Sequence, residues 1–577
     1  MPAALCRISP KKEDSMKKNR KLLLVLTALA ALFLSACGGG GGTDASSREE
    51  KLDLSGSSAA GEKTESEEKS GKQELTYVLS NLPDSIDPSY TNNSFAMYVI
   101  RNCFEGLVTY NQKGEIEAGD AESWESNDDM TVYTFHLRKD LKWSDGTALT
   151  AKDYVYAARH VCTPETTAQY ANLFTDYIVG AKEFYDKGDD SDFGVRAIDD
   201  QTLEYRLKGP CSFFLDLVSM WCYSPLKEET LTKNGDRWTQ SAESYICNGP
   251  FRLSEVNNGE SYVLVRNENY WDAEHTTLEK LTFRFVLDSS TALTAYENGE
   301  VDGIRSIPSG DIQRLKAENA GIIMEPSYGS VFYDINCQKE PYNNPLVRKA
   351  ICLAVDREEL ISNVVQIDAT PAYSMLPPGY SVDGKDITEG REDFSLKPKA
   401  DPELAREALK EAGYEDPKSF PTLQLSYYSD DTAKKIAEAI AEMLKKNLGI
   451  SVDVTSADWA VYYDGVRQGN YDVCAMGWSA DYLNPMSFLP LVYTDDVSNN
   501  VRFSDPAYDK IVDEARVEPD QKKFAELVKE ADKLQAAQYP VLPLYYKMNN
   551  FLMHDNVSGY YMIPDGSLFF RYTKLRK

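Results

Sequence analysis

The sequence is poor in the residues that most catalytic centres use. It has only four histidines, which are His136, His160, His275 and His554. None belongs to a His-Glu-x-x-His metal-binding motif, and the Gly-x-Ser-x-Gly turn of a serine hydrolase is missing too. The sequence also lacks the complete Gly-x-x-x-x-Gly-Lys-Ser/Thr loop that holds a nucleotide phosphate, because the run from Gly379 to Lys385 is followed by Asp386. These absences argue against an enzyme and against a resident metal or cofactor, although the abundant acidic residues leave a carboxylate-based glycosidase open.

Paired cysteine motifs and an excess of basic charge are absent as well. Ten cysteines are present, and no two of them form Cys-x-x-Cys, so the usual zinc and redox spacings are missing. The 62 lysines and arginines are outnumbered by 91 aspartates and glutamates, which gives a net charge of −29. A chain this acidic repels nucleic acid, so we expect no nucleic-acid partner.

The N-terminal segment has the pattern of an export signal. A basic cluster at Lys17–Lys21 is followed by the apolar run Leu22–Leu34, which is too short to be a good membrane-spanning helix. The run ends in Leu34-Ser35-Ala36-Cys37, which resembles a bacterial lipobox. This resemblance implies that residues 1–36 form a lipoprotein signal peptide and that Cys37 carries the lipid, on the outer face of the cell membrane. A plain signal peptide or an uncleaved anchor remains the alternative.

The rest of the chain divides into a linker and a large globular part. Residues 37–72 are rich in Gly, Ser, Glu and Lys and have few large apolar side chains, which predicts a flexible linker. Beyond it, residues 131–138 alternate polar and apolar positions like a strand, whereas 433–447 have the period of an amphipathic helix and precede a strand at 450–454. This pattern predicts a mixed α/β fold, and the length of 577 residues predicts more than one domain.

Several segments resemble the oligopeptide-binding proteins of peptide-importing ABC transporters, which are family 5 extracellular solute-binding proteins. They follow the family's order over about residues 75–577, and the main ones are Leu82–Pro88, Arg101–Leu107, Phe135–Thr147, Asn248–Phe251, Arg266–Asp272 and Gly477–Tyr482. The resemblance implies a monomeric protein that captures an oligopeptide and delivers it to the permease subunits of the transporter.

The family resemblance also implies a two-lobed, periplasmic-binding-protein-like α/β fold of type II, with an extra subdomain, mixed sheets, flanking helices and a hinge. Lobe I would consist of residues 73–108, 229–328 and 546–577, with the subdomain at 109–228 and lobe II at 329–545. The hinge strands would lie near Ser327 and Lys547.

Asp481 is the principal site residue that the resemblance implies, as the ion-pair partner of the ligand's α-amino group. A cleft that closes on an ammonium group needs a carboxylate, because an unpaired buried charge is unfavourable. The alternative is an aspartate that caps the turn before Asn484-Pro485. Three further sets of ligand contacts are implied: backbone groups of Gly477, Trp478, Ser479 and Ala480; a facing segment with Ser94, Ala96 and Met97; and side-chain pockets lined by Trp459, Trp478 and Asn248.

One departure from the family pattern concerns the ligand's C-terminus. Some relatives have an arginine immediately before the Gly-Trp pair, where it meets the ligand's carboxylate. This chain has Cys474-Ala475-Met476 there, so the carboxylate has no obvious partner in the segment. The sequence therefore leaves peptide length open, together with the alternatives of a dipeptide, signalling peptide, sugar or metal-complex ligand on the same fold, and of an exported hydrolase.

Overall fold

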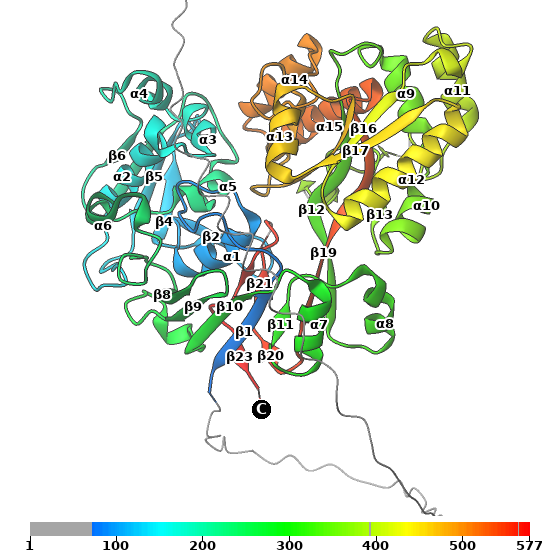
Figure 1. The fold of residues 1–577 in the computed structure, drawn as a ribbon. Helices are drawn as coiled ribbons and strands as arrows, with labels where there is room; N and C mark the ends of the chain where they lie inside the picture. Colours follow the sequence, from blue (N-terminus) through cyan, green and yellow to red (C-terminus); the bar gives the residue numbers. More distant parts are fainter. Residues whose placement is uncertain (1–71, 383, 392–393, 564, 577) are drawn as a thin grey trace, which may run out of the picture. The chain divides into compact units, whose positions relative to one another are not determined.

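The computed structural model describes residues 72–382, 384–391, 394–563 and 565–576, which belong to one compact unit. Cys37 and the predicted signal peptide and linker up to residue 71 lie outside these residues. The described part is mixed α/β, as predicted (Figure 1). Its eight cysteines are free thiols, and seven of them are buried. None of the described helices combines the length and apolar character needed to cross a lipid bilayer.

One large sheet connects most of the described residues. Its strand order is β17 (Val452–Ala457), β16 (Leu423–Tyr428), β18 (Val473–Ser479), β12 (Ile322–Ile335), β19 (Val541–Met553), β11 (Gly303–Ile304), β1 (Glu74–Leu79), β10 (Lys280–Phe285), β9 (Ser261–Arg266) and β8 (Phe251–Asn257), and β13 (Thr370–Pro371) also pairs with β19. Strands from both ends of the chain therefore meet in one sheet, which explains why the predicted lobe I is discontinuous in sequence.

The long antiparallel strands β12 and β19 join the two halves of this sheet (Figure 1). Their register is regular from Ile322 to Pro326, shifts before Ser330 and again between Val331 and Phe332, and then continues to Asp334. A bulge weakens the local ladder and lets the strands bend. The hinge predicted near Ser327 and Lys547 falls on this irregularity and stays a prediction.

The remaining strands form small sheets. A four-stranded sheet has the order β4 (Ala121–Ser126), β5 (Val132–Leu137), β7 (Thr202–Arg206) and β6 (Val195–Ala197), and all of it lies within the predicted subdomain. Two-stranded pairs are β2 (Val108–Tyr110) with β3 (Ile116–Ala118), β14 (Ser381–Val382) with β15 (Lys385–Asp386), β20 (Val557–Ser558) with β23 (Lys574–Leu575), and β21 (Tyr561–Met562) with β22 (Leu568–Phe569).

Amphipathic helices cover the sheets and form the cores with them. The α-helices are α1 (Ser94–Cys103), α2 (Ala151–Val161), α3 (Ala171–Thr175), α4 (Ala181–Lys187), α5 (Phe214–Val218), α6 (Glu228–Asn234), α7 (Ser289–Glu297), α8 (Ile312–Ala317), α9 (Pro345–Leu353), α10 (Arg357–Glu359), α11 (Pro402–Glu411), α12 (Asp431–Leu448), α13 (Trp459–Gln468), α14 (Pro506–Arg516) and α15 (Gln521–Gln538). One core lies among α9, α11, α12 and the strands β16 and β18, and a larger core includes α1, α2 and the four-stranded sheet.

Candidate functional site

Strand β18 has one edge that is only partly paired. It lies antiparallel to β12 along its whole length, from Val473 opposite Ile335 to Ser479 opposite Gly329. On its other side, β16 pairs only with Val473 and Cys474. Within the described residues, no strand covers this side of β18 from Ala475 to Ser479. An uncovered strand edge presents backbone groups that an extended peptide can pair with.

A cavity of about 300 Å³ lies beside this edge. Its lining residues come from β12, β16, β18, β19 and the starts of α12 and α13, and they are Val331, Tyr333, Tyr428, Asp430, Thr432, Ala433, Ile436, Trp459, Ala475, Met476, Gly477, Tyr545 and Lys547. The wall combines aromatic rings with two charged side chains. Such a wall offers apolar contact area together with hydrogen-bonding groups, which suits a ligand with varied side chains.

Trp459 is the most exposed aromatic residue of this wall. Its side chain remains 54% exposed, although it stacks on Tyr463 with ring centroids 5.3 Å apart and meets the edge of Tyr428 at 5.4 Å. Exposure of a large aromatic ring next to a cavity is typical of a surface that a ligand covers. The structure therefore places Trp459 in the wall of this cavity, and its contact with a ligand stays a prediction.

Asp481 lies just beyond the end of β18 and is half-buried. Its Oδ1 accepts a hydrogen bond of 2.6 Å from the hydroxyl of Tyr170, and its backbone N–H donates to Ser487 Oγ at 2.9 Å. Loss of water contact raises the pKa of Asp481 to about 7, the negative charge of Asp565 adds to the rise, and the Tyr170 hydrogen bond opposes it. Among the described residues no cation forms an ion pair with this carboxylate, so it can accept an ammonium group.

The turn that follows does not use the Asp481 side chain as a cap. Asn484 has that role, because its Oδ1 accepts from the N–H of Met486 at 3.0 Å. The carboxylate of Asp481 instead contacts Tyr170, which lies 311 residues earlier in the chain. The structure therefore does not support the capping alternative for the Asp481 side chain.

The four residues that precede Asp481 differ in accessibility. Ser479 is exposed, Gly477 and Trp478 are half-buried, and Ala480 is buried with its N–H donating to Tyr328 O at 2.6 Å. The Trp478 ring contributes to the core rather than standing free as Trp459 does. Gly477 and Ser479 are thus the members of this segment most open to a ligand.

The other predicted contacts are held inside the protein. Asn248 is 3% exposed; its amide donates to Glu105 O at 2.9 Å and to Asp120 Oδ2 at 2.8 Å, and its oxygen accepts from the Glu105 N–H. Ala96 and Met97 are buried in α1, and their N–H groups bond to Asn93. These positions do not support direct ligand contact by Asn248, Ala96 or Met97, whereas Ser94 is exposed.

Two residues at the site carried no signal in the sequence. Tyr170 precedes the short helix α3, and nothing in its local pattern connects it to Asp481. Lys547 was predicted only as a hinge position, yet it lines the cavity and its ammonium group donates to Ser479 Oγ at 2.9 Å. Both depend on contacts between segments that are distant in sequence.

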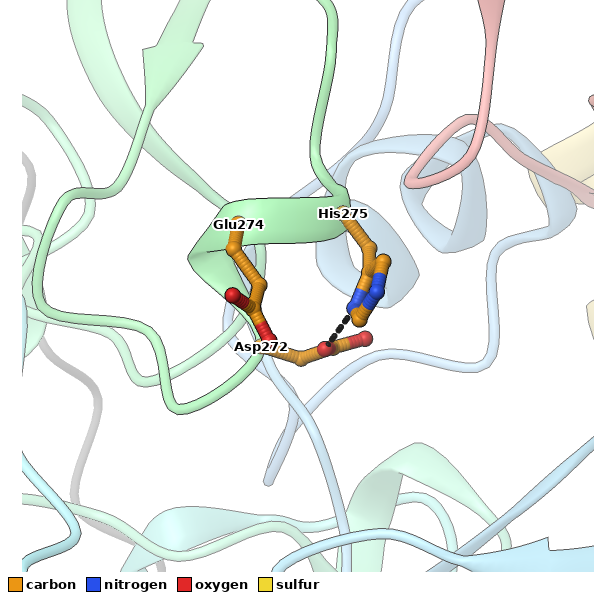
Figure 2. A group of neighbouring side chains, drawn as sticks. All are labelled: Asp272, Glu274 and His275. Atoms are coloured by element: carbon orange, nitrogen blue, oxygen red, sulfur yellow. Dashed lines mark hydrogen bonds and ion pairs between the residues drawn. The ribbon is translucent and has the colours of Figure 1, made fainter.

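Possible metal ligands gather at a different place. In the described residues, one group of three lies close enough to hold an ion, and it consists of Asp272, Glu274 and His275 (Figure 2). The Asp272 carboxylate hydrogen-bonds to His275 Nδ1 and raises the pKa of that imidazole. Glu274 and His275 are exposed, and no strand of the candidate site contributes to the group. The arrangement is an ion pair at a surface turn.

Comparisons with known proteins agree with this geometry. Residues 115–500 match the model of the bacterial extracellular solute-binding proteins, family 5. The oligopeptide-binding protein OppA of Bacillus subtilis is 32% identical over 524 residues, which cover 89% of this chain and 94% of that protein. The murein tripeptide binding protein MppA of Escherichia coli has a similar structure, with a TM-score of 0.77 and 32% identity over 88% of this chain and 99% of that one. OppA of Haemophilus influenzae, in complex with RPPGFSPFR, has a TM-score of 0.76 at 29% identity, covering 88% and 99%.

Proposed function

Because the chain belongs to the family 5 bacterial extracellular solute-binding proteins, we propose that it captures oligopeptides outside the cytoplasm and delivers them to the permease of an ABC transporter. The fold class expected from the sequence, two-lobed and periplasmic-binding-protein-like, is that of its structural neighbours. The observation that carries the proposal is the uncovered edge of β18, which ends next to an unpaired carboxylate at Asp481.

The proposed mechanism is capture without chemistry. An extended peptide adds to β18 through backbone hydrogen bonds, which explains how varied side chains could be accepted. Its ammonium group pairs with Asp481, and Trp459 covers a side chain. Bending at the β12–β19 irregularity then closes the lobes over the ligand, and the permease recognises the closed form.

A direct test uses protein that has been stripped of bound ligand by reversible unfolding. Calorimetric titration with a mixed set of peptides of three to six residues should give saturable binding, whereas sugars and nickel complexes should give none. Binding of a sugar or a metal complex in place of every peptide would contradict the proposal. The fold would then serve another solute.

The pH dependence of binding should follow the carboxylate at the site. Ammonium binding needs ionised Asp481, and a group with a pKa of about 7 becomes mostly protonated below that pH. The ligand's own amino group is charged below about pH 7.7. Affinity should therefore fall about tenfold between pH 7.5 and pH 5.5, as measured by calorimetry at both values. Unchanged affinity at pH 5.5 would remove ionised Asp481 from the binding step.

We also propose that the protein is a lipid-anchored monomer held by Cys37 at the outer face of the membrane. The support is the lipobox-like segment Leu34–Cys37 together with the extracellular family. Changing Cys37→Ser should move the protein from the membrane fraction to the soluble exported fraction, because a single polypeptide without lipid loses its anchor. Cys6→Ser is the matched control and should leave the distribution unchanged. Membrane retention of the Cys37→Ser protein would indicate an uncleaved anchor.

A further inference from the structure

Lys547 is an unpaired cation beside the uncovered edge of β18. The residue is half-buried on β19, it lines the cavity of about 300 Å³, and no carboxylate of the described residues forms an ion pair with it. Its one hydrogen-bond partner there is neutral, the hydroxyl of Ser479. A cation kept partly out of water without a counter-ion is unfavourable unless an anion completes the site.

Two glycines allow Lys547 to reach this position. Strands β18 and β19 lie on opposite sides of β12, so the lysine side chain must cross β12 to reach Ser479. It crosses at Gly329, where an added Cβ would lie 2.8 Å from Lys547 Cδ, and it passes Gly477, where a Cβ would lie 3.6 Å from Cε. Any larger residue at Gly329 would meet the lysine stem and the backbone oxygen of Trp478.

A second cation contributes positive charge to the same region. Arg305 follows β11; its Nε donates to the hydroxyl of Tyr98 at 3.1 Å, and its guanidinium lies 4.6 Å from the ring of Phe95. It is close enough to Lys547 to help lower the pKa of that lysine to about 8, mainly an effect of lost water contact. The positive charge therefore comes from two separate segments of the predicted lobe I, the one that holds Arg305 and the one that holds Lys547. The acid in the cavity wall, Asp430, already accepts from the N–H of Ala433 at 2.8 Å.

We propose that Lys547, assisted by the Ser479 hydroxyl, binds the C-terminal carboxylate of a short peptide whose ammonium group is held by Asp481. This inference rests on the proposed function and assigns the partner that the Cys474-Ala475-Met476 segment lacks. The lysine ammonium lies beside residues 477–479, which are two to four residues from Asp481 along β18. At about 3.3 Å per residue, this separation is about 7–13 Å and fits extended peptides of two to four residues.

The test compares three forms of one tripeptide on the complete chain purified in detergent: the free peptide, its C-terminal amide and its N-acetyl form. Amidation should weaken binding by about tenfold to a hundredfold, the range for one charge-assisted hydrogen-bonded contact. Lys547→Met should weaken binding of the free peptide by the same factor and leave binding of the amide unchanged. The effects of the substitution and of amidation on affinity are then not additive. Lys547→Arg should restore part of the loss.

The controls separate this inference from the proposed function. Lys410→Met removes an exposed lysine that pairs with Glu415 and should change nothing. If the tripeptide binds and acetylation weakens it, but amidation does not, the role of Lys547 is overturned and the function stands. A further probe is an amidated tripeptide with glutamate at its third position. If it binds as tightly as the free acid, and Lys547→Met weakens both equally, the C-terminal assignment is also overturned. If no peptide form binds, the proposed function itself fails.

Discussion

Replacing Asp481 with asparagine should weaken peptide binding by about 30- to 3,000-fold. Asparagine keeps the size of the side chain and can still accept the Tyr170 hydrogen bond, but it removes the charge that pairs with the ligand's ammonium group. Loss of one member of a desolvated charge pair costs about 2–5 kcal/mol, and 1.4 kcal/mol corresponds to a tenfold change in affinity. Calorimetric titration of the variant with a tetrapeptide measures the effect.

The matched control for this change is Asp464→Asn. Asp464 is exposed on α13 and accepts from Gln468 at 2.7 Å, so its neutralisation should leave affinity within about twofold. The pH dependence described above should also disappear in the Asp481→Asn protein. An Asp481→Asn protein that binds as tightly as the wild type would contradict the placement of the ligand's amino terminus.

Replacing Arg571 with methionine should destabilise the protein by about 3–5 kcal/mol, because it breaks a buried ion pair. The Arg571 guanidinium lies 3.1 Å from Glu105, and the two side chains are 3% and 5% exposed. Glu105 also accepts from Trp271 Nε1 at 2.6 Å, but without Arg571 this buried carboxylate loses its ion-pair partner. Urea unfolding, monitored by tryptophan fluorescence, should show a lower midpoint urea concentration for the variant than for the wild type.

Arg314→Met provides the comparison for Arg571. Arg314 pairs with Glu297, Asp311 and Glu318 at the surface, where its side chain is 40% exposed. Exposed pairs contribute about 0–1 kcal/mol, so this variant should unfold close to the wild type. Equal midpoints for the Arg571 and Arg314 variants would show that the buried pair does not stabilise the fold beyond an ordinary surface pair.

Local sequence patterns predicted the regular elements well, because each pattern reports a local preference. The alternation at 131–138 corresponds to β5, and the periodic segment 433–447 corresponds to α12. The strand expected at 450–454 begins two residues later, at Val452, because Gly449 ends α12 in the left-handed conformation and Ser451 belongs to the connection. The Gly-Trp motif located strand β18 in the sequence. That no strand pairs with one side of β18 from Ala475 to Ser479 depends on the order of strands in the described sheet, which local sequence does not report.

The site was predicted only where its residues lie together in sequence. Asp481 and its β18 neighbours form one short motif. Tyr170 reaches the site through a side-chain hydrogen bond to Asp481, and Lys547 reaches it through the pairing of β19 with β12. Asn248 was predicted from a family motif to contact the ligand. Its amide instead donates hydrogen bonds to buried groups of the protein, the Glu105 carbonyl oxygen and the Asp120 carboxylate. The limits of the lobes and the ligand contacts stay predictions.

The most direct measurement of the central claim is calorimetry on ligand-stripped protein with peptides of three to six residues and their N-acetylated twins. Acetylation removes the ammonium charge and leaves the rest of each peptide unchanged. We predict that each acetylated peptide binds at least tenfold more weakly than its free twin, and that this difference vanishes in the Asp481→Asn protein. Equal binding of the twins by the wild type would contradict the account, because the carboxylate at the end of β18 would then have no ligand to pair with.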